Sequence, residues 1–128
     1  MRRMFAGLTA ATFVLALGVP AFAKVETVKG TLVDQGCYRA DKTNTGQKHT
    51  MKSGPMDDCA TMCAKMGMPV ALVTTDGKVY AVTGDFAANK NEKLVPHMAH
   101  TVELTGEVTT ENDGSMKIAV SNLKMVSK

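Results

Sequence analysis

The clearest regularity in the chain is an alternation of apolar and polar residues near its C-terminus. The segment TVELTGEVT, from residue 101, carries an apolar residue or a glycine at every second position: Val102, Leu104, Gly106 and Val108. A period of two predicts a strand with one buried face. The segment MKIAV repeats the alternation after the turn sequence ENDGS. Together they predict a β-hairpin.

A second hairpin is predicted in the middle of the chain. The segments PVALVTT and KVYAVT flank Asp76 and Gly77, a dipeptide that favours tight turns between twisted strands. The segment VETVKGTLV, after residue 24, supplies a fifth strand. Gly30 and Gly106 stand where a strongly coiled strand can bend around a small barrel.

Between the third and fourth predicted strands lies GDFAANKNEKLVPHMAH, a polar loop with a short apolar turn around Leu94 and Val95. Five strands with a short helical turn at this place have the order of an OB-like barrel. The chain therefore resembles small secreted bacterial OB-fold proteins, which implies a compact binding scaffold without fixed chemistry. The predicted fold class is mainly β: a small five-stranded OB-like barrel with one inserted cysteine-bearing helix.

The first 23 residues are predicted to be a signal peptide. Arg2 and Arg3 precede an apolar run, and Pro20 is followed by the small-x-small ending of residues 21–23. This order is typical of an export signal, and the run is too short to span a bilayer stably. We expect cleavage after Ala23 and a single periplasmic or secreted domain over residues 24–128, without stable membrane insertion.

Loss of the leader changes the charge and aromatic content. Without Arg2 and Arg3, the 15 basic residues of the chain become 13 against 12 acidic ones, a net charge of +1. The remaining aromatic residues are Tyr38, Tyr80 and Phe86. Because single-stranded nucleic acid is bound by stacking on aromatic side chains in a basic groove, we expect no nucleic-acid partner.

The predicted barrel carries an insertion at about residues 35–68, where a short loop is usual. Within it, Pro55 and Gly67 predict a helix from about Pro55 to Met66, with the GMP sequence at its end. Helical spacing places four sulfur-containing residues on one face: Cys59, Met62, Cys63 and Met66. Cysteine and methionine are good core residues, so this stripe could simply pack on the barrel.

The chain has three cysteines, and their spacing also suits a metal site. Cys37, Cys59 and Cys63 follow the pattern C-x21-C-x3-C, which resembles the cysteines of TRASH-type heavy-metal domains, without the aromatic residues around them. His49 is a candidate fourth ligand. Three thiolates and an imidazole suit zinc, and nearby methionine thioethers favour Cu(I). We therefore expect a secreted protein that handles or buffers zinc or copper.

The alternative is a disulfide-stapled OB-fold binding or adaptor module with structural cysteines. A bond between Cys59 and Cys63 is awkward because Cβ atoms four residues apart on a helix are about 5–6 Å apart, whereas a disulfide needs roughly 3.5–4.5 Å. Cys37 would then pair with one of them and leave a spare thiol. A second soft-metal site is a further candidate at HMAH, residues 97–100.

No enzymatic activity is expected. The C-x3-C spacing is not the C-x-x-C of thioredoxin-like enzymes, and the βαβ context of those enzymes is missing. The sequence contains no G-x-S-x-G, phosphate-loop or H-E-x-x-H motif. Asp57 and Asp58 are adjacent, so they fall on different faces of a helix and cannot act as an opposed carboxylate pair.

Overall fold

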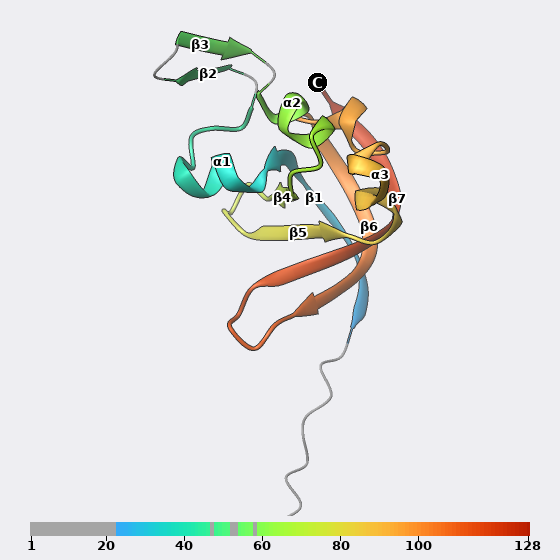
Figure 1. Ribbon diagram of the computed structural model, residues 1–128. Coiled ribbons are helices and arrows are strands. Elements are labelled where there is room, and N and C mark those ends of the chain that lie inside the picture. The colour runs from blue at the N-terminus through green and yellow to red at the C-terminus, as the bar shows by residue number, and fades with distance from the viewer. Residues whose placement is uncertain (1–22, 47, 52–53, 58) are drawn as a thin grey trace, which may run out of the picture.

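A computed structural model describes residues 23–46, 48–51, 54–57 and 59–128, with the backbone alone at 48–51 and 54–57. The predicted signal peptide lies outside the described residues except for Ala23. Five strands close into a barrel in the order β1-β4-β5-β7-β6 (Figure 1). These strands are β1 (Lys24–Asp34), β4 (Val70–Val73), β5 (Val79–Thr83), β6 (Thr101–Thr110) and β7 (Met116–Ser127). Strands β5 and β7 are parallel, and the other neighbours are antiparallel. The mainly β fold class with a five-stranded barrel is confirmed.

The barrel is filled by the apolar positions of the alternating strands. Along β6, Val102 and Leu104 are fully buried, and Ile118 of β7, which pairs with Val108, is fully buried as well. Leu32 of β1 and Leu72 of β4 are fully buried in the same core cluster. Burying each leucine or isoleucine side chain contributes about 1.5–3 kcal/mol to folding. The period of two in the sequence thus identifies the inward face correctly.

Gly106 is required by the close approach of β6 and β7. A Cβ atom built on Gly106 would lie 2.2 Å from the carbonyl oxygen of Ala119. The register of the two strands also shifts between Thr105 and Gly106, as at a β-bulge. Because a bulge increases local twist and bend, β6 coils around the barrel at this point. The predicted bending position at Gly106 is confirmed.

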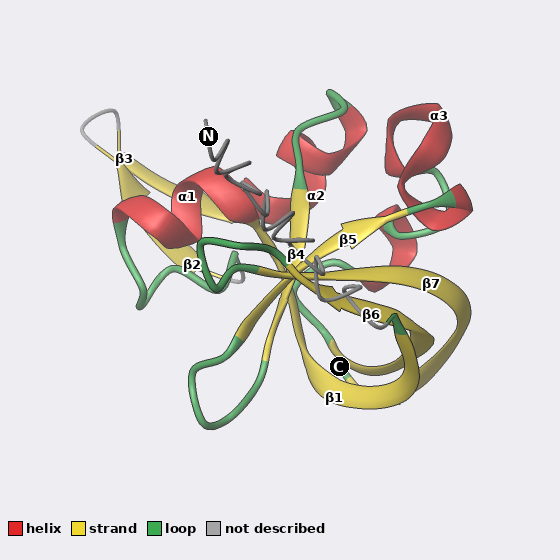
Figure 2. Ribbon diagram, turned by 90° about the horizontal axis from the view of Figure 1, so that it is seen from below, coloured by secondary structure: helices red, strands yellow, loops and turns green. Residues whose placement is uncertain are grey.

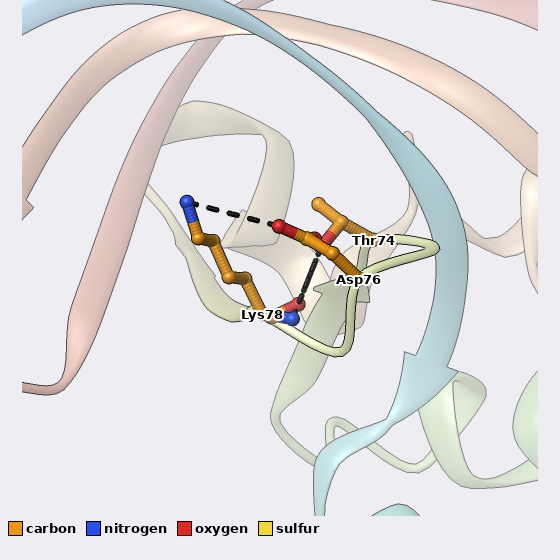
Figure 3. Close-up of polar contacts among 3 residues, drawn as sticks. All are labelled: Thr74, Asp76 and Lys78. Carbon is orange, nitrogen blue, oxygen red and sulfur yellow. Dashed lines mark hydrogen bonds and ion pairs between the residues drawn. The ribbon is translucent and has the colours of Figure 1, made fainter.

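The β4–β5 hairpin turns through Thr74 to Lys78 (Figure 3). Gly77 adopts a φ of +85°, and its N–H donates to the carbonyl oxygen of Thr74 at 3.0 Å. The Thr74 hydroxyl donates to Asp76 and accepts from the N–H of Lys78, at 3.0 Å in the second case. The Lys78 ammonium lies 3.8 Å from the Asp76 carboxylate. The predicted hairpin is confirmed, with glycine at the left-handed position of a three-residue loop.

The described residues between β1 and β4 form a cap on one end of the barrel (Figure 1), and we call this region, residues 35–69, the cysteine cap. It contains α1 (Gln35–Ala40), β2 (Lys48–Met51), β3 (Gly54–Asp57) and α2 (Cys59–Lys65). The predicted start of the helix at Pro55 is wrong, because residues 54–57 pair with 48–51 as an antiparallel ribbon. Proline is tolerated at the edge of such a ribbon, where its missing N–H need not pair.

Three short helical segments connect β5 to β6: η1 (Asp85–Ala87), α3 (Ala88–Asn91) and η2 (Val95–His97). Leu94, at the predicted apolar turn, is fully buried. Segment α3 is a turn in which Asn89, Lys90 and Asn91 have left-handed φ values of 53–58°. None of the helices in the described ranges is long and apolar enough to cross a membrane.

Candidate metal centre

The barrel brings the two ends of the cysteine cap together. Strand β1 leads into α1, and α2 leads into β4, the antiparallel neighbour of β1. Asp34 lies opposite Val70 in this pairing, and the N–H of Gln35 donates to the carbonyl oxygen of Pro69 at 2.9 Å. The start of α1 therefore lies beside the segment that joins α2 to β4, and α1 and α2 are neighbours (Figure 2). Cys37 and the cysteines of α2 meet although 21 residues separate Cys37 from Cys59.

Asp34 fixes the first turn of α1. It is the N-cap residue, and its Oδ1 atom accepts a hydrogen bond of 2.7 Å from the backbone N–H of Cys37. Asp34 is only 6% exposed. A side-chain oxygen that accepts from an orphan N–H stabilises a helix start, typically by about 1 kcal/mol. Helix α1 buries no residue of its own, so the N-cap hydrogen bond from Cys37 to Asp34 is a main determinant of where Cys37 lies.

Helix α2 packs on the barrel through small residues. Ala60 and Ala64 are buried, and both belong to the core cluster. Gly46, with a φ of +85°, approaches α2 so closely that an added Cβ would lie 2.2 Å from the Cβ of Ala60. Small residues on both sides of this contact allow α2 to lie close to the preceding loop. This packing fixes the position of α2, and with it the positions of Cys59 and Cys63.

The C-terminus of α2 is closed by a Schellman motif. The N–H of Met68 donates to the carbonyl oxygen of Cys63 at 3.1 Å, and that of Gly67 donates to Ala64 at 2.9 Å. Gly67 has the left-handed φ of +86° that this motif needs. The buried Asn91 side chain of α3 donates to the carbonyl oxygens of Ala64 and Met68 at 3.0 and 2.9 Å. The predicted helix end at Gly67 is confirmed.

The three cysteines converge on one point. The Sγ atoms of Cys37, Cys59 and Cys63 all lie within 4.8 Å of one another, and those of Cys37 and Cys59 are 3.9 Å apart. All three are free thiols, with Cys59 buried and the other two half-buried. Zinc–sulfur bonds of about 2.3 Å place two sulfurs of a tetrahedral site about 3.8 Å apart. The cluster has the dimensions of a thiolate metal site, whereas a disulfide bond is about 2.05 Å.

The surroundings favour the protonated thiols of Cys37 and Cys63. Burial raises the pKa of the Cys37 thiol, and the adjacent Asp34 side chain, with its hydrogen bond and negative charge, raises it further. Burial is also the first cause that raises the pKa of Cys63, followed by the charge of Asp34. A metal ion that binds here must therefore displace protons, so its affinity increases with pH.

The predicted sulfur stripe does not pack on the barrel as a whole. Met62 is 52% exposed and Met66 is 62% exposed, whereas Cys59 is 3% exposed. The packing face of α2 is instead formed by Ala60, Ala64 and Cys59. The interpretation of the whole stripe as a core face is wrong, because Ala60 and Ala64, and not the methionines, make the contact of α2 with the core.

Sequence reasoning missed Asp34 and left His49 unresolved. The signal for Asp34 was an aspartate at the end of a predicted strand, three residues before a cysteine, which is the N-cap spacing. His49 lies in β2 with its backbone opposite Met56. The side chain of His49 lies outside the described part of the structure, so its predicted role as fourth ligand stays a prediction.

The histidines of HMAH lie apart from the cysteine cluster. Among the described residues, the only group of three or more cysteine, histidine and acidic ligands close enough for one ion is the three cysteines. The Nδ1 atoms of His97 and His100 are buried and have no hydrogen-bond partner within the described ranges. Burial and the neighbouring His100 both lower the pKa of His97. His97 therefore favours its neutral form.

Two surface hollows flank α1 and are candidates for small-ligand binding. Their volumes are about 420 and 390 Å³, and Tyr38 and Lys42 line both. Lys29 and five threonines add polar groups to the larger one, and Arg39 and Lys117 add positive charge to the smaller. No cysteine is among the residues that line them. They would serve a binding module independently of the thiols.

Comparison with family models, with curated proteins and with solved structures gave no match. The OB-like character of the chain therefore rests on its strand order alone, and the likeness to TRASH-type domains rests on three cysteine positions. The cluster of thiols is itself the observation that points to a site.

Proposed function

We propose that the exported protein binds one soft or borderline metal ion, zinc or copper, at Cys37, Cys59 and Cys63, and that it handles or buffers this ion without acting as an enzyme. The observation that carries the proposal is the convergence of three free Sγ atoms within 4.8 Å from two helices far apart in sequence. We further propose a periplasmic or secreted location, on the basis of the N-terminal sequence, and His49 as a fourth ligand.

An oxidising compartment outside the cytoplasm favours cysteines that bind a metal over cysteines that remain as free thiols. In an oxidising compartment, free cysteines tend to form disulfides, yet three cysteines cannot all pair within one chain. A metal ion would protect all three thiolates together and would add its binding free energy to the stability of a cap whose two helices bury few side chains. Soft sulfur ligands suit Cu(I) and zinc, and they disfavour magnesium and calcium.

The alternative function is a binding or adaptor module stapled by one disulfide. Cys37 and Cys59, with Sγ atoms 3.9 Å apart, are the pair that oxidation would join. Cys63 would then remain as a spare thiol, and the hollows beside α1 would be the binding surface. The three thiols are free in the structure, which favours the metal site.

Metal stoichiometry and a thiol count together separate these functions. Protein without the leader is purified anaerobically with reductant, titrated with Zn²⁺ and with Cu(I) against a competing chelator, desalted and measured for metal content. We expect about one ion per chain and protection of all three thiols from alkylation. Each of the variants Cys37→Ser, Cys59→Ser and Cys63→Ser should lose most of the affinity, because metal-bound thiolates act as a set.

The variant His97→Ala/His100→Ala is the matched control, and it should bind the ion as the wild type does. Retention of one ion by the triple serine variant would place the metal elsewhere and contradict the proposal. Protein purified without reductant tests the alternative: no stoichiometric ion, together with one disulfide and one free thiol, would support the stapled module instead. His49→Ala tests the fourth ligand separately and should reduce affinity less than loss of a cysteine.

A further inference from the structure

Three exposed methionines lie in or just after α2, the helix that carries Cys59 and Cys63. Among the described residues, five large hydrophobic side chains are exposed, and three of them are Met62, Met66 and Met68 at 52%, 62% and 47%. The other two, Val25 and Val126, lie near the ends of the long strands β1 and β7. Three exposed thioethers therefore lie within residues 62–68, in and just after one short helix.

The helix geometry places two of these thioethers beside Cys63. The N–H of Met66 donates to the carbonyl oxygen of Met62 at 3.2 Å, so the helical spacing continues through position 66. Residues four apart on a helix lie on the same face, with Cβ atoms about 5–6 Å apart. Cys59 and Cys63 occupy the same face by the same spacing. Met62 follows Cys59, and Met66 follows Cys63, by three residues, a spacing that also places side chains on one face. The two exposed methionines therefore extend the row of cysteines toward solvent.

Exposure decreases in steps along this face. Met62 and Met66 are more than half exposed, Cys63 is half-buried, and Cys59 is 3% exposed. The exposed thioethers therefore share a helix face with a partly accessible thiol and a buried one. Packing does not account for the two methionines, because Ala60 and Ala64 form the contact of α2 with the core.

We propose that Met62 and Met66 form an entry site that captures Cu(I) by its affinity for thioethers and passes it to Cys63 and the three-cysteine cluster. This inference rests on the proposed function and names its cargo as Cu(I). Thioether sulfur is a soft, neutral ligand that binds Cu(I) and has little affinity for Zn²⁺. Transfer is a ligand exchange: a copper–thioether bond breaks, a copper–thiolate bond forms, and the thiol proton leaves to water. The copper remains Cu(I) throughout.

The double variant Met62→Leu/Met66→Leu isolates the sulfur atoms. Leucine preserves apolar size and helix propensity, so the fold and any apolar contact surface are retained. Anaerobic stopped-flow measurement follows Cu(I) leaving a coloured chelator for the protein. We expect transfer to slow by about tenfold, in the range seen when groups around a metal site are removed. Zn²⁺ uptake and the final copper content should be unchanged, and Met125→Leu, on β7, should match the wild type.

The outcomes distinguish the entry site from the proposed function. Equal Cu(I) transfer rates in the wild type and the double variant would overturn the entry site while leaving the cysteine site intact. Slowing of Zn²⁺ to the same extent would also overturn it, because the effect would then be steric. Failure of the wild type to take up either ion would remove the proposed function, and the entry site with it.

A second measurement tests capture directly, without the cysteines. In the triple serine variant, Ag(I), a soft ion that does not change oxidation state, is added while the methionine methyl signals are followed by NMR. We expect the signals of Met62 and Met66 to shift and that of Met125 to stay in place. Shifts that are absent, or equal for all methionines, would contradict the entry site.

Discussion

The barrel and the cysteine cap are built by different means. In the barrel, alternating strands bury large side chains such as Leu72, Leu104 and Ile118. In the cysteine cap, α1 buries no residue and α2 buries only Cys59, Ala60 and Ala64. Because the stabilisation from burial follows the apolar area removed from water, the barrel holds most of the folding free energy. The cysteine cap is held by helix capping, turns and close backbone contacts. A bound ligand could therefore add a large share of the free energy that stabilises this region.

The largest expected effect comes from the barrel. Leu104→Ala should lower the free energy of unfolding by about 2–5 kcal/mol, because the buried methyl groups are lost and a cavity remains. Denaturant unfolding with and without the metal measures this loss, which should be the same in both states if the barrel and the cysteine cap are energetically separate. The control Val25→Ala, at a side chain that is 68% exposed, should change little. A loss confined to the metal-free state would show that the two regions are coupled.

Sequence reasoning succeeded where a local pattern of residues determines a strand or a helix end. The alternation of Val102, Leu104 and Gly106 predicted β6 and its inward face, and Gly67 predicted the end of α2. It failed where tertiary pairing decides: Pro55 reads as a helix start, yet the segment is a ribbon strand paired with residues 48–51. The spacing of the cysteines suggested a site, but only the β1–β4 pairing brings Cys37 to α2.

The exposure of side chains along α2 was also not predictable from local spacing alone. Helical spacing groups Cys59, Met62, Cys63 and Met66 but cannot say which edge of that group faces the barrel. Ala60 and Ala64 make the contact with the barrel. Alanine is common on both buried and exposed helix faces, so these two residues did not indicate the packing face. Asp34 was missed for a similar reason, since an aspartate at a strand end has many ordinary uses.

An effect of at most the same size is expected where α2 contacts the loop that precedes it. Gly46→Ala adds a Cβ that would lie 2.2 Å from the Cβ of Ala60, at a φ of +85° that disfavours any side chain. The left-handed backbone costs about 1–2 kcal/mol, and the overlap adds about 1–3 kcal/mol unless α2 shifts. If α2 shifts, the affinity for the metal should fall by about 10–100-fold. Unfolding curves and competitive metal titration measure the two responses.

Gly114→Ala is the matched control for this prediction. Gly114, on the β6–β7 turn, has the same φ of +85°, but nothing lies within 4 Å of the point that an added Cβ would occupy. It should therefore show the backbone cost alone and leave metal affinity unchanged. Equal stability and equal affinity in the two variants would mean that the contact between Gly46 and Ala60 does not position α2.

The smallest expected effect concerns the charge beside the thiols in the metal-free protein. Asp34→Asn keeps a side-chain oxygen that can accept from the N–H of Cys37, so the helix cap is retained, but it removes the negative charge that raises the pKa of Cys37 and Cys63. The thiols should alkylate faster with iodoacetamide at neutral pH, by about tenfold for each unit by which the pKa falls. Asp85→Asn, on η1, should react as the wild type does.

The dependence of stability on pH gives the same prediction a second readout. A thiol whose pKa is raised by the fold releases its proton less readily when folded than when unfolded, where its ordinary value is 9.0. Its contribution to stability is therefore fully present below about pH 9 and is lost as the pH rises through the higher folded value. The metal-free wild type should lose stability in this range, and Asp34→Asn should lose less. Parallel alkylation rates and parallel stability curves for the two proteins would show that burial alone, without the Asp34 charge, keeps these thiols protonated.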